Sequence, residues 1–291
     1  SLNALPSTVE SLMWMPGTLK ILPSRNLRRL AITRLNPGYL RLLPTTLEAL
    51  EIGMASESTQ GEIFPPKLTS LLVKAWKNSL LSSLSHSALP FLNDLTTSTF
   101  GTEWAVLEYL PATLRSLTIT MDATTQFEAS FPFWPRCASL TQLTILKSAS
   151  VTPGTLCMLP PGLRSLNIHP EAGYVHPDSL REMQRFPLLD ECTFTRVESP
   201  RQDVLLTDDH LDGTLPPSLT RLTLQGERSN VSVSAFLLLP KKLSIVTLPP
   251  NLLVLASLTR FDVHSAMRRV TMGHDDWFPI SGLNNSTVPN E

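Results

Sequence analysis

The 291-residue chain contains little cysteine: its three cysteines are Cys137, Cys157 and Cys192. This number is small and odd, and no two of them form a C-x-x-C pair. The sequence therefore predicts no disulfide framework and favours a reducing compartment, so we expect a cytoplasmic protein. No basic stretch followed by an apolar run marks a secretory signal. The chain begins at Ser1 without an initiator methionine, and we expect it to be a fragment or a processed form.

Charge of either sign is also scarce, since charged residues make up 17% of the chain and the formal net charge is -1 at pH 7. So small a net charge creates no field that would attract nucleic acid, and we expect no nucleic-acid partner. No apolar run reaches the roughly 18 residues of a membrane-spanning helix, so we expect no membrane span. Hydrophobic residues make up 42% of the chain, which is enough for a packed core.

The compact motifs of common enzyme classes are missing too. The sequence has no glycine-rich phosphate loop and no G-x-S-x-G elbow. Its two tight clusters of histidine and carboxylate, Asp208-Asp209-His210 and His274-Asp275-Asp276, lack a second ligand pair. We interpret the first as a polar loop and the second as part of a tail, and we expect His169 and His176 to be solvated turn residues. The sequence therefore predicts no enzyme activity, no cofactor and no metal site.

What the sequence does contain is one motif repeated along the chain, with the pattern apolar-Pro-x-x-Leu-x-x-Leu-x-apolar. Strong copies begin at Leu5, Leu43, Phe64, Leu110, Leu159, Leu215 and Leu239, and weaker copies cover residues 26–32, 89–95, 140–145, 189–194 and 258–263. Adjacent copies start about 21 to 29 residues apart, which indicates a stack of short structural units.

The physics of one copy explains the pattern. In residues 114–119, Leu117 and Ile119 are two positions apart, so a β-strand points both side chains to one face. Ser116 and Thr118 then point to the opposite face. Proline at the second position of the motif has no N–H and disfavours helix in the residue before it. We therefore expect the proline to end a helical turn and lead the chain into the strand.

Short helical signals lie between the expected strands. Asn36-Pro37-Gly38 and Thr152-Pro153-Gly154 each place a polar cap before proline, as a helix start requires. Ser179 and Glu182 have the spacing of a capping box. Residues 121–136 and 195–212 are longer than one turn requires, and we expect them to form loops.

This motif and its spacing resemble the leucine-rich-repeat family, and its form is similar to the repeats of bacterial effector ubiquitin ligases and of protist and fungal repeat proteins. The resemblance implies an α/β repeat solenoid, a leucine-rich-repeat horseshoe or arc. Its parallel β-sheet forms the concave face, and short helical or irregular turns form the convex face. We expect residues 1–264 to hold about ten to twelve irregular repeats, and residues 265–291 to form a C-terminal cap or a disordered tail.

The sequence departs from the family in two ways. Family repeats continue after the strand to an asparagine that bonds the backbone of the turn, but the corresponding positions here are Ala55, Asp122, Glu171 and Glu227. We therefore expect packing of leucine and proline to hold the convex side instead. The catalytic cysteine domain of the effector ligases has no counterpart, and none of the three cysteines is expected to act as a nucleophile.

The side chains that point away from the core form the candidate binding surface. We predict a partner-binding face that includes Arg29, Glu51, Leu72, Thr118, Gln142, Asn167, Glu191, Arg221, Thr223, Arg260 and Asp262. Arginine and large apolar side chains carry much of the binding energy of protein interfaces, so the charged members, Leu72 and Met13 are the expected anchors. The threonines also have a simpler explanation, because threonine favours exposed strand positions.

These observations predict a non-catalytic protein–protein interaction module whose partner protein binds the concave sheet. Two alternatives stay open. The chain is the substrate-recognition part of a ubiquitin ligase, with ubiquitin-ligase components as partners; this rests on the resemblance alone. Or it is an extracellular recognition domain, against which the lack of paired cysteines argues.

Overall fold

The computed structural model describes residues 8–14, 26–35, 38–55, 63–74, 89–98, 110–121, 137–148, 150–171, 173–197, 205–226, 229–232, 234–248, 269–272 and 276–279. The chain divides into two compact units. Unit 1 consists of residues 1–125 and 130–143, and unit 2 consists of residues 126–129 and 144–291.

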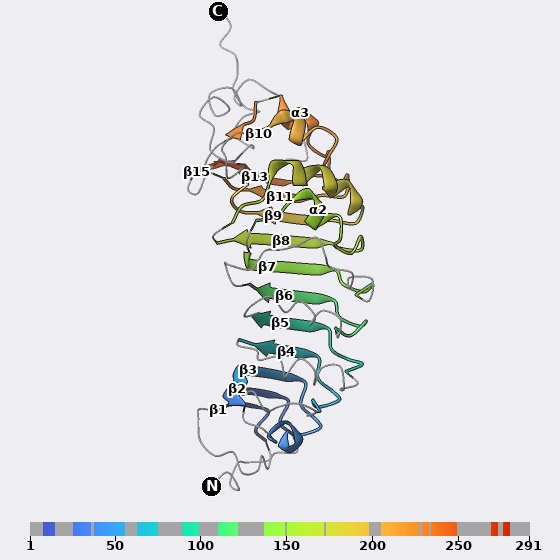
Figure 1. Cartoon of the computed structure of the whole chain (residues 1–291), viewed down its shortest axis with the longest axis vertical. Coiled ribbons are helices and arrows are strands. Elements are labelled where there is room, and N and C mark those ends of the chain that lie inside the picture. Colours follow the sequence, from blue (N-terminus) through green and yellow to red (C-terminus); the bar gives the residue numbers. More distant parts are fainter. Residues whose placement is uncertain are drawn as a thin grey trace, which may run out of the picture. The chain divides into compact units, whose positions relative to one another are not determined.

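Unit 1 is built on a parallel sheet whose strands follow the order of the chain. The strands are β1 (Ser11–Trp14), β2 (Arg29–Leu35), β3 (Ala49–Ala55), β4 (Ser70–Val73), β5 (Asp94–Ser98) and β6 (Ser116–Thr120). Figure 1 shows these strands, blue to green, lying side by side. The short 3-10 helix η2 (Leu40–Leu42) connects β2 to β3. Strand β7 (Gln142–Ser148) lies across the division between the units in sequence.

Unit 2 repeats this plan with longer connections. Its sheet contains β8 (Ser165–Pro170), β9 (Glu191–Phe194), β11 (Arg221–Leu224), β13 (Ile245–Leu248) and β14 (Arg269–Met272), which are parallel, and β15 (Asp276–Pro279), which is antiparallel to β14. Strands β10 (Leu206–Thr207) and β12 (Ser229–Asn230) form a separate parallel pair. The helical segments are α2 (Pro153–Leu156), η5 (Pro177–Arg185), η6 (Asp208–His210) and α3 (Ala235–Leu238).

The predicted inward positions are confirmed. In β6, Leu117 and Ile119 are buried, whereas Ser116 and Thr118 on the other face are half-buried. The same alternation appears in β8, where Leu166 is buried. Each unit therefore packs one face of its sheet into a core of leucine, isoleucine and valine, and leaves the other face available.

The end of the repeat series lies partly outside the described residues. The weak copy expected at residues 258–263 lies outside the described residues. In the described part, the strand that follows β13 in the sheet is β14. The division of the chain into repeats at 1–264 and a cap or tail at 265–291 stays a prediction.

The proline of the motif is the first residue of a hydrogen-bonded turn, which is more specific than the role we expected for it. The carbonyl of Pro111 accepts a hydrogen bond from the N–H of Leu114 at 3.1 Å, which closes a tight turn just before β6. The same bond joins Pro44 to Leu47, Pro65 to Leu68, Pro160 to Leu163, Pro216 to Leu219 and Pro240 to Leu243. Proline therefore opens a turn whose last residue is the buried leucine that stands two positions before the next strand.

Hydroxyl groups, in addition to leucine and proline packing, hold consecutive repeats together. Thr69 Oγ1 donates to the carbonyl of Glu48 at 3.0 Å, and Thr220 Oγ1 donates to that of Asp190 at 3.0 Å. Equivalent bonds come from Thr46, Thr113, Thr141, Ser218 and Ser244. These serines and threonines lie just before the strands and bond the backbone of the preceding repeat, so we name them the hydroxyl ladder. We did not predict it from the sequence.

Two glycines mark places where consecutive repeats approach closely: Gly53 within β3, and Gly226 just after β11. A Cβ atom on Gly53 would lie 2.5 Å from the carbonyl oxygen of Thr33, and one on Gly226 would lie 2.6 Å from that of Val197. In unit 2, Val151, Val175 and Val197 continue this contact as parallel β-bridges. Backbone bonds thus occupy the region where the family's asparagine would stand.

The expected helix starts are confirmed in one case and wrong in another. Thr152 caps α2 in a capping box with Thr155. Ser179 does not cap a helix: η5 begins at Pro177, and Nδ1 of His176 accepts the N–H of Asp178 instead. The Ser179 hydroxyl is buried and donates to the carbonyl of Val151.

Other expectations fall partly outside the described residues. Asn36, Pro37 and residues 122–136 lie there. Within residues 195–212, expected to form a loop, the described part contains β10 and η6.

Candidate functional site

The exposed face of the unit 1 sheet carries two rows of side chains that strand pairing sets in register. The Met13 row contains Met13, Ala31, Glu51, Leu72, Thr96 and Thr118. The Arg29 row, two residues nearer the start of each strand, contains Ser11, Arg29, Ala49, Ser70, Asp94 and Ser116. Because parallel pairing places these residues side by side, their relative positions are fixed by the backbone.

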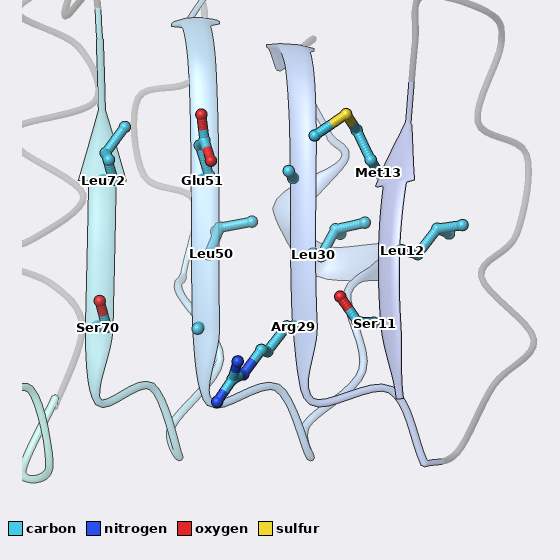
Figure 2. A pocket seen from close by; sticks show the side chains of 11 residues that line it. Ser11, Leu12, Met13, Arg29, Leu30, Leu50, Glu51, Ser70 and Leu72 are labelled. Atoms are coloured by element: carbon cyan, nitrogen blue, oxygen red, sulfur yellow. The ribbon is translucent and has the colours of Figure 1, made fainter. Parts of the chain in front are cut away.

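A hollow of about 350 Å³ lies over β1 to β4 on this face. Small side chains leave the space: Ala31 stands between Met13 and Glu51, and Ala49 between Arg29 and Ser70. Figure 2 shows Met13 pointing from β1 toward β2, and Arg29 reaching from β2 toward β3. The Met13 side chain is 72% exposed, which is high for a large apolar residue. We name this feature the unit 1 hollow.

Of the two charged residues that line the hollow, the acidic one has an ion-pair partner and the basic one has none among the described residues. Glu51 Oε1 lies 2.6 Å from Nζ of Lys74, so this carboxylate is neutralised by the residue that follows β4. Arg29 forms no ion pair with any residue that the structure describes. The lining therefore keeps one uncompensated positive charge beside apolar side chains.

The exposed face of the unit 2 sheet is different in character. One row contains Asn167, Thr193, Thr223 and Thr247, and the other contains Ser165, Glu191, Arg221 and Ile245. Arg221 Nη1 lies 2.8 Å from Oε1 of Glu191, its direct neighbour across β11 and β9. These two expected charged anchors therefore satisfy each other.

The structure places most of the predicted site residues on the exposed sheet faces. It brings Arg29, Glu51 and Leu72 together at the unit 1 hollow, with Met13. Thr118 and Gln142 belong to unit 1, and Asn167, Glu191, Arg221 and Thr223 to unit 2. Arg260 and Asp262 lie outside the described residues. A binding role for any of them stays a prediction.

Sequence reasoning read Ala31 and Ala49 only as outward positions of the sheet; it did not predict the hollow that they leave, and it missed Lys74. Ala31 and Ala49 are unremarkable one at a time, but small residues in adjacent repeats leave space when their strands lie side by side. Aligning repeats by their leucines would reveal this signal. The Lys74–Glu51 pair joins the residue after one strand to the middle of another, so it depends on a register that the motif alone does not specify.

His210, which we expected in a polar loop, is a buried residue at the end of the short helix η6. Its Nδ1 accepts the N–H of Thr207 at 3.2 Å and lies 2.8 Å from the Thr207 hydroxyl, while Nε2 lies 3.5 Å from Oδ1 of Asp178. Burial lowers the pKa of His210, and this outweighs the opposing effect of the Asp178 carboxylate. The neighbouring Asp208 accepts the N–H of Ser232 at 2.6 Å. This cluster joins repeats and caps η6.

The other histidines also differ from expectation. His176 is the cap of η5. His169 is on the exposed face of β8, half-buried, and burial lowers its pKa. In the described part of the chain, no group of three or more His, Cys, Asp or Glu side chains is arranged to hold a metal ion. The second cluster, at His274 and Asp275, lies outside that part.

All three cysteines are free. Cys137 and Cys192 are buried, which raises the pKa of Cys137 to about 11 and raises the pKa of Cys192 further. Cys157 is half-buried, and its Sγ donates to the carbonyl of Gly154. Thiols held protonated in an apolar core are poor nucleophiles.

Parallel strands with inward leucines and short helical turns define the leucine-rich-repeat fold, and this chain has it. The leucine-rich-repeat protein TLR13, in its complex with ssRNA13, is similar in structure, with a TM-score of 0.54 and 14% identity over 86% of this chain. An internalin (InlF) from Listeria monocytogenes is similar as well, with a TM-score of 0.50 and 14% identity over 93% of this chain and 88% of the internalin.

At this identity the likeness concerns the fold. The match spans 39% of the TLR13 chain. No protein-family model and no curated protein sequence matches this chain. Among the helices of the described residues, none combines the length and apolar character that crossing a membrane requires.

Proposed function

We propose that this chain is a non-catalytic protein-interaction module and that a partner protein binds the exposed face of its parallel sheet. The observation that carries this proposal is the unit 1 hollow, where an exposed methionine and an unpaired arginine flank two alanines on a sheet held by backbone hydrogen bonds. Arginine and methionine are enriched in protein interfaces. A rigid backbone also reduces the entropy lost when a partner binds.

The chemistry of this face favours binding over catalysis. Among the described side chains of the two sheet faces, no hydroxyl or thiol bonds a histidine, so the pairing that activates a nucleophile is missing there. Cys137 and Cys192, whose thiols have raised pKa values, belong to the core.

A protein partner fits this face better than a nucleic acid does. The structurally similar TLR13 is described in complex with ssRNA13. The present chain, however, has a net charge of -1, and on the described sheet faces Arg221 is paired with Glu191 and Glu51 with Lys74. These described faces therefore offer little free positive charge for contacts with phosphate groups. The ubiquitin-ligase and extracellular alternatives have no specific contact in their favour and stay predictions, as does a cytoplasmic location.

The proposal can be tested by selecting ligands from a phage-displayed library of protein fragments on the purified chain. We expect the selected fragments to bind the wild type, and to lose at least about tenfold in affinity, or roughly 1.4 kcal/mol, with Leu72→Lys or Thr118→Arg. The matched control is Leu188→Lys, because Leu188 is also exposed but belongs to the turn before β9. The proposal is refuted if the affinity of the selected fragments is unchanged by both sheet-face substitutions but is lowered by Leu188→Lys, because binding then occurs outside the sheet face.

A further inference from the structure

The unit 1 hollow has a shape suited to one or two side chains. Its volume of about 350 Å³ is at the lower end of the range for small-molecule sites. Its lining includes the small side chains of Ala31 and Ala49 and the larger apolar side chains of Met13 and Leu72. These lining groups favour an aliphatic or aromatic side chain, and methionine adapts its shape to such an occupant.

The electrostatics add a second requirement. Arg29 belongs to the same lining, and the nearest acidic residue of its own row is Asp94, three strands away. At a strand spacing of about 4.8 Å this separation is about 14 Å, which exceeds the roughly 8 Å screening length at physiological ionic strength. Glu51, the acidic residue of the lining, is held by Lys74 at 2.6 Å. Arg29 is therefore available to an external carboxylate.

The distance between the two requirements indicates the form of the occupant. Ala31 and Arg29 are two positions apart on one strand, which is about 6.6 Å along an extended backbone. An extended peptide lying along β2 has the same repeat distance between alternate side chains. It can place an apolar side chain over Ala31 and a carboxylate beside the Arg29 guanidinium.

We propose that the unit 1 hollow binds an extended acidic peptide segment of another protein, in which an apolar residue and an aspartate or glutamate are two positions apart. This inference rests on the proposed function, because it names the chemistry of the partner at the same sheet face. Arginine provides paired donors for a carboxylate, so the contact discriminates between an acid and its amide.

The probe is a set of synthetic octapeptides that contain a Leu-Ser-Asp or Phe-Ser-Glu core, with Gly and Ser at all other positions. In matched peptides, Asn or Gln replaces the acid, or Ser replaces the apolar residue. We expect the purified chain to prefer the acidic peptides about fivefold over their amides, the upper range for an exposed ion pair. Arg29→Gln should abolish this preference, and Arg29→Lys should retain part of it. Arg221→Gln is the control, because Arg221 is paired with Glu191.

A second variant tests the hollow itself. Ala31→Leu fills the space above β2 and should abolish binding of the apolar side chain. If that variant fails to fold by circular dichroism, Leu72→Gln, at a half-buried position, gives the same test. Loss of binding to the apolar peptides without loss of native structure is the expected result.

The outcomes separate the two proposals. An acid preference that survives Arg29→Gln overturns the inference. So does peptide or fragment binding at the sheet face with no acid preference, although the proposed function then stands. Concentration-dependent dimerisation in light scattering, abolished by Ala31→Leu, identifies a second copy as the occupant and overturns the inference. If no ligand responds to Leu72→Lys or Thr118→Arg, the proposed function fails as well.

Discussion

Leu166 tests the assignment of inward and outward faces most directly. It is the first inward residue of β8, it is 0% exposed, and its partner across the ladder is the buried Cys192 of β9. We expect Leu166→Asp to destabilise unit 2 severely, because a carboxylate would then lie among apolar side chains without a partner.

The size of the effect follows from this burial. Shortening a buried leucine to alanine costs about 2–5 kcal/mol, since contacts are lost and a cavity remains. Aspartate adds the cost of an unsatisfied polar group, about 1–3 kcal/mol, even when its carboxyl group takes up a proton. The sum, roughly 3–8 kcal/mol, is comparable to the whole free energy of unfolding of a typical domain, about 5–15 kcal/mol.

The matched control is Asn167→Asp, which introduces the same side chain one residue later, on the half-buried opposite face. Urea unfolding followed by far-ultraviolet circular dichroism should show a large loss for Leu166→Asp and a change within about 0.5 kcal/mol for Asn167→Asp. Equal unfolding midpoints for the two variants would refute the assigned alternation of β8.

Three further outcomes are expected. Thr220→Val removes one bond of the hydroxyl ladder and should lower the free energy of unfolding by about 1 kcal/mol, whereas Thr223→Val on the sheet face should not; equal urea midpoints for both variants would contradict the ladder. In the native protein only Cys157 should react rapidly with Ellman's reagent, because the other two thiols are buried with raised pKa values; rapid reaction of all three would be inconsistent with the fold. Burial lowers the pKa of His210 from 6.5 in the folded protein. Above pH 6.5 His210 is neutral in both the folded and the unfolded chain. Below pH 6.5 the unfolded chain takes up a proton at this histidine before the folded protein does, so the free energy of unfolding falls. This fall, measured by urea unfolding across pH 5 to 8, should be shallower in His210→Gln, and an unchanged slope would exclude the effect.

The fold was predictable because each repeat carries its own signal. Leu117 and Ile119 are two positions apart, and the same spacing recurs along the chain, so period-2 alternation in many copies assigns the inward face without any knowledge of tertiary contacts. Repetition strengthens this interpretation, because a single copy of the motif would fit a buried helix almost as well.

The capping of η5 was not predictable from local sequence alone. Ser179 and Glu182 have the spacing of a capping box, but His176 stands just before Pro177, and proline is favoured in the first helical turn. The Ser179 hydroxyl is bonded to Val151, 28 residues earlier. Competition of this kind is decided by a neighbouring repeat, which a local motif does not contain.

The sequence predicted which face of the sheet carries the candidate site, but not where on that face the hollow lies. Reading alternate residues identified Arg29, Glu51 and Leu72 as outward, but the hollow depends on which residues become neighbours across strands. The repeats differ in length, so sequence spacing does not give the neighbours directly. The pairing of β2 with β3 shows the neighbours: Ala31 lies beside Glu51, and Ala49 lies beside Arg29. The two alanines are therefore close together on adjacent strands.

The same register decides which charges of the sheet faces are free. Glu191 stands directly opposite Arg221, and cross-strand partners lie about 5 Å apart, so these two side chains neutralise each other. Arg29 stands opposite Ser11 and Ala49, neither of which carries a charge. Two arginines at equivalent positions of the repeat therefore differ in what they offer a partner. The difference comes from the adjacent repeats, so exchanging Ala49 for Glu should give Arg29 the paired state of Arg221 and remove the acid preference without altering Arg29 itself.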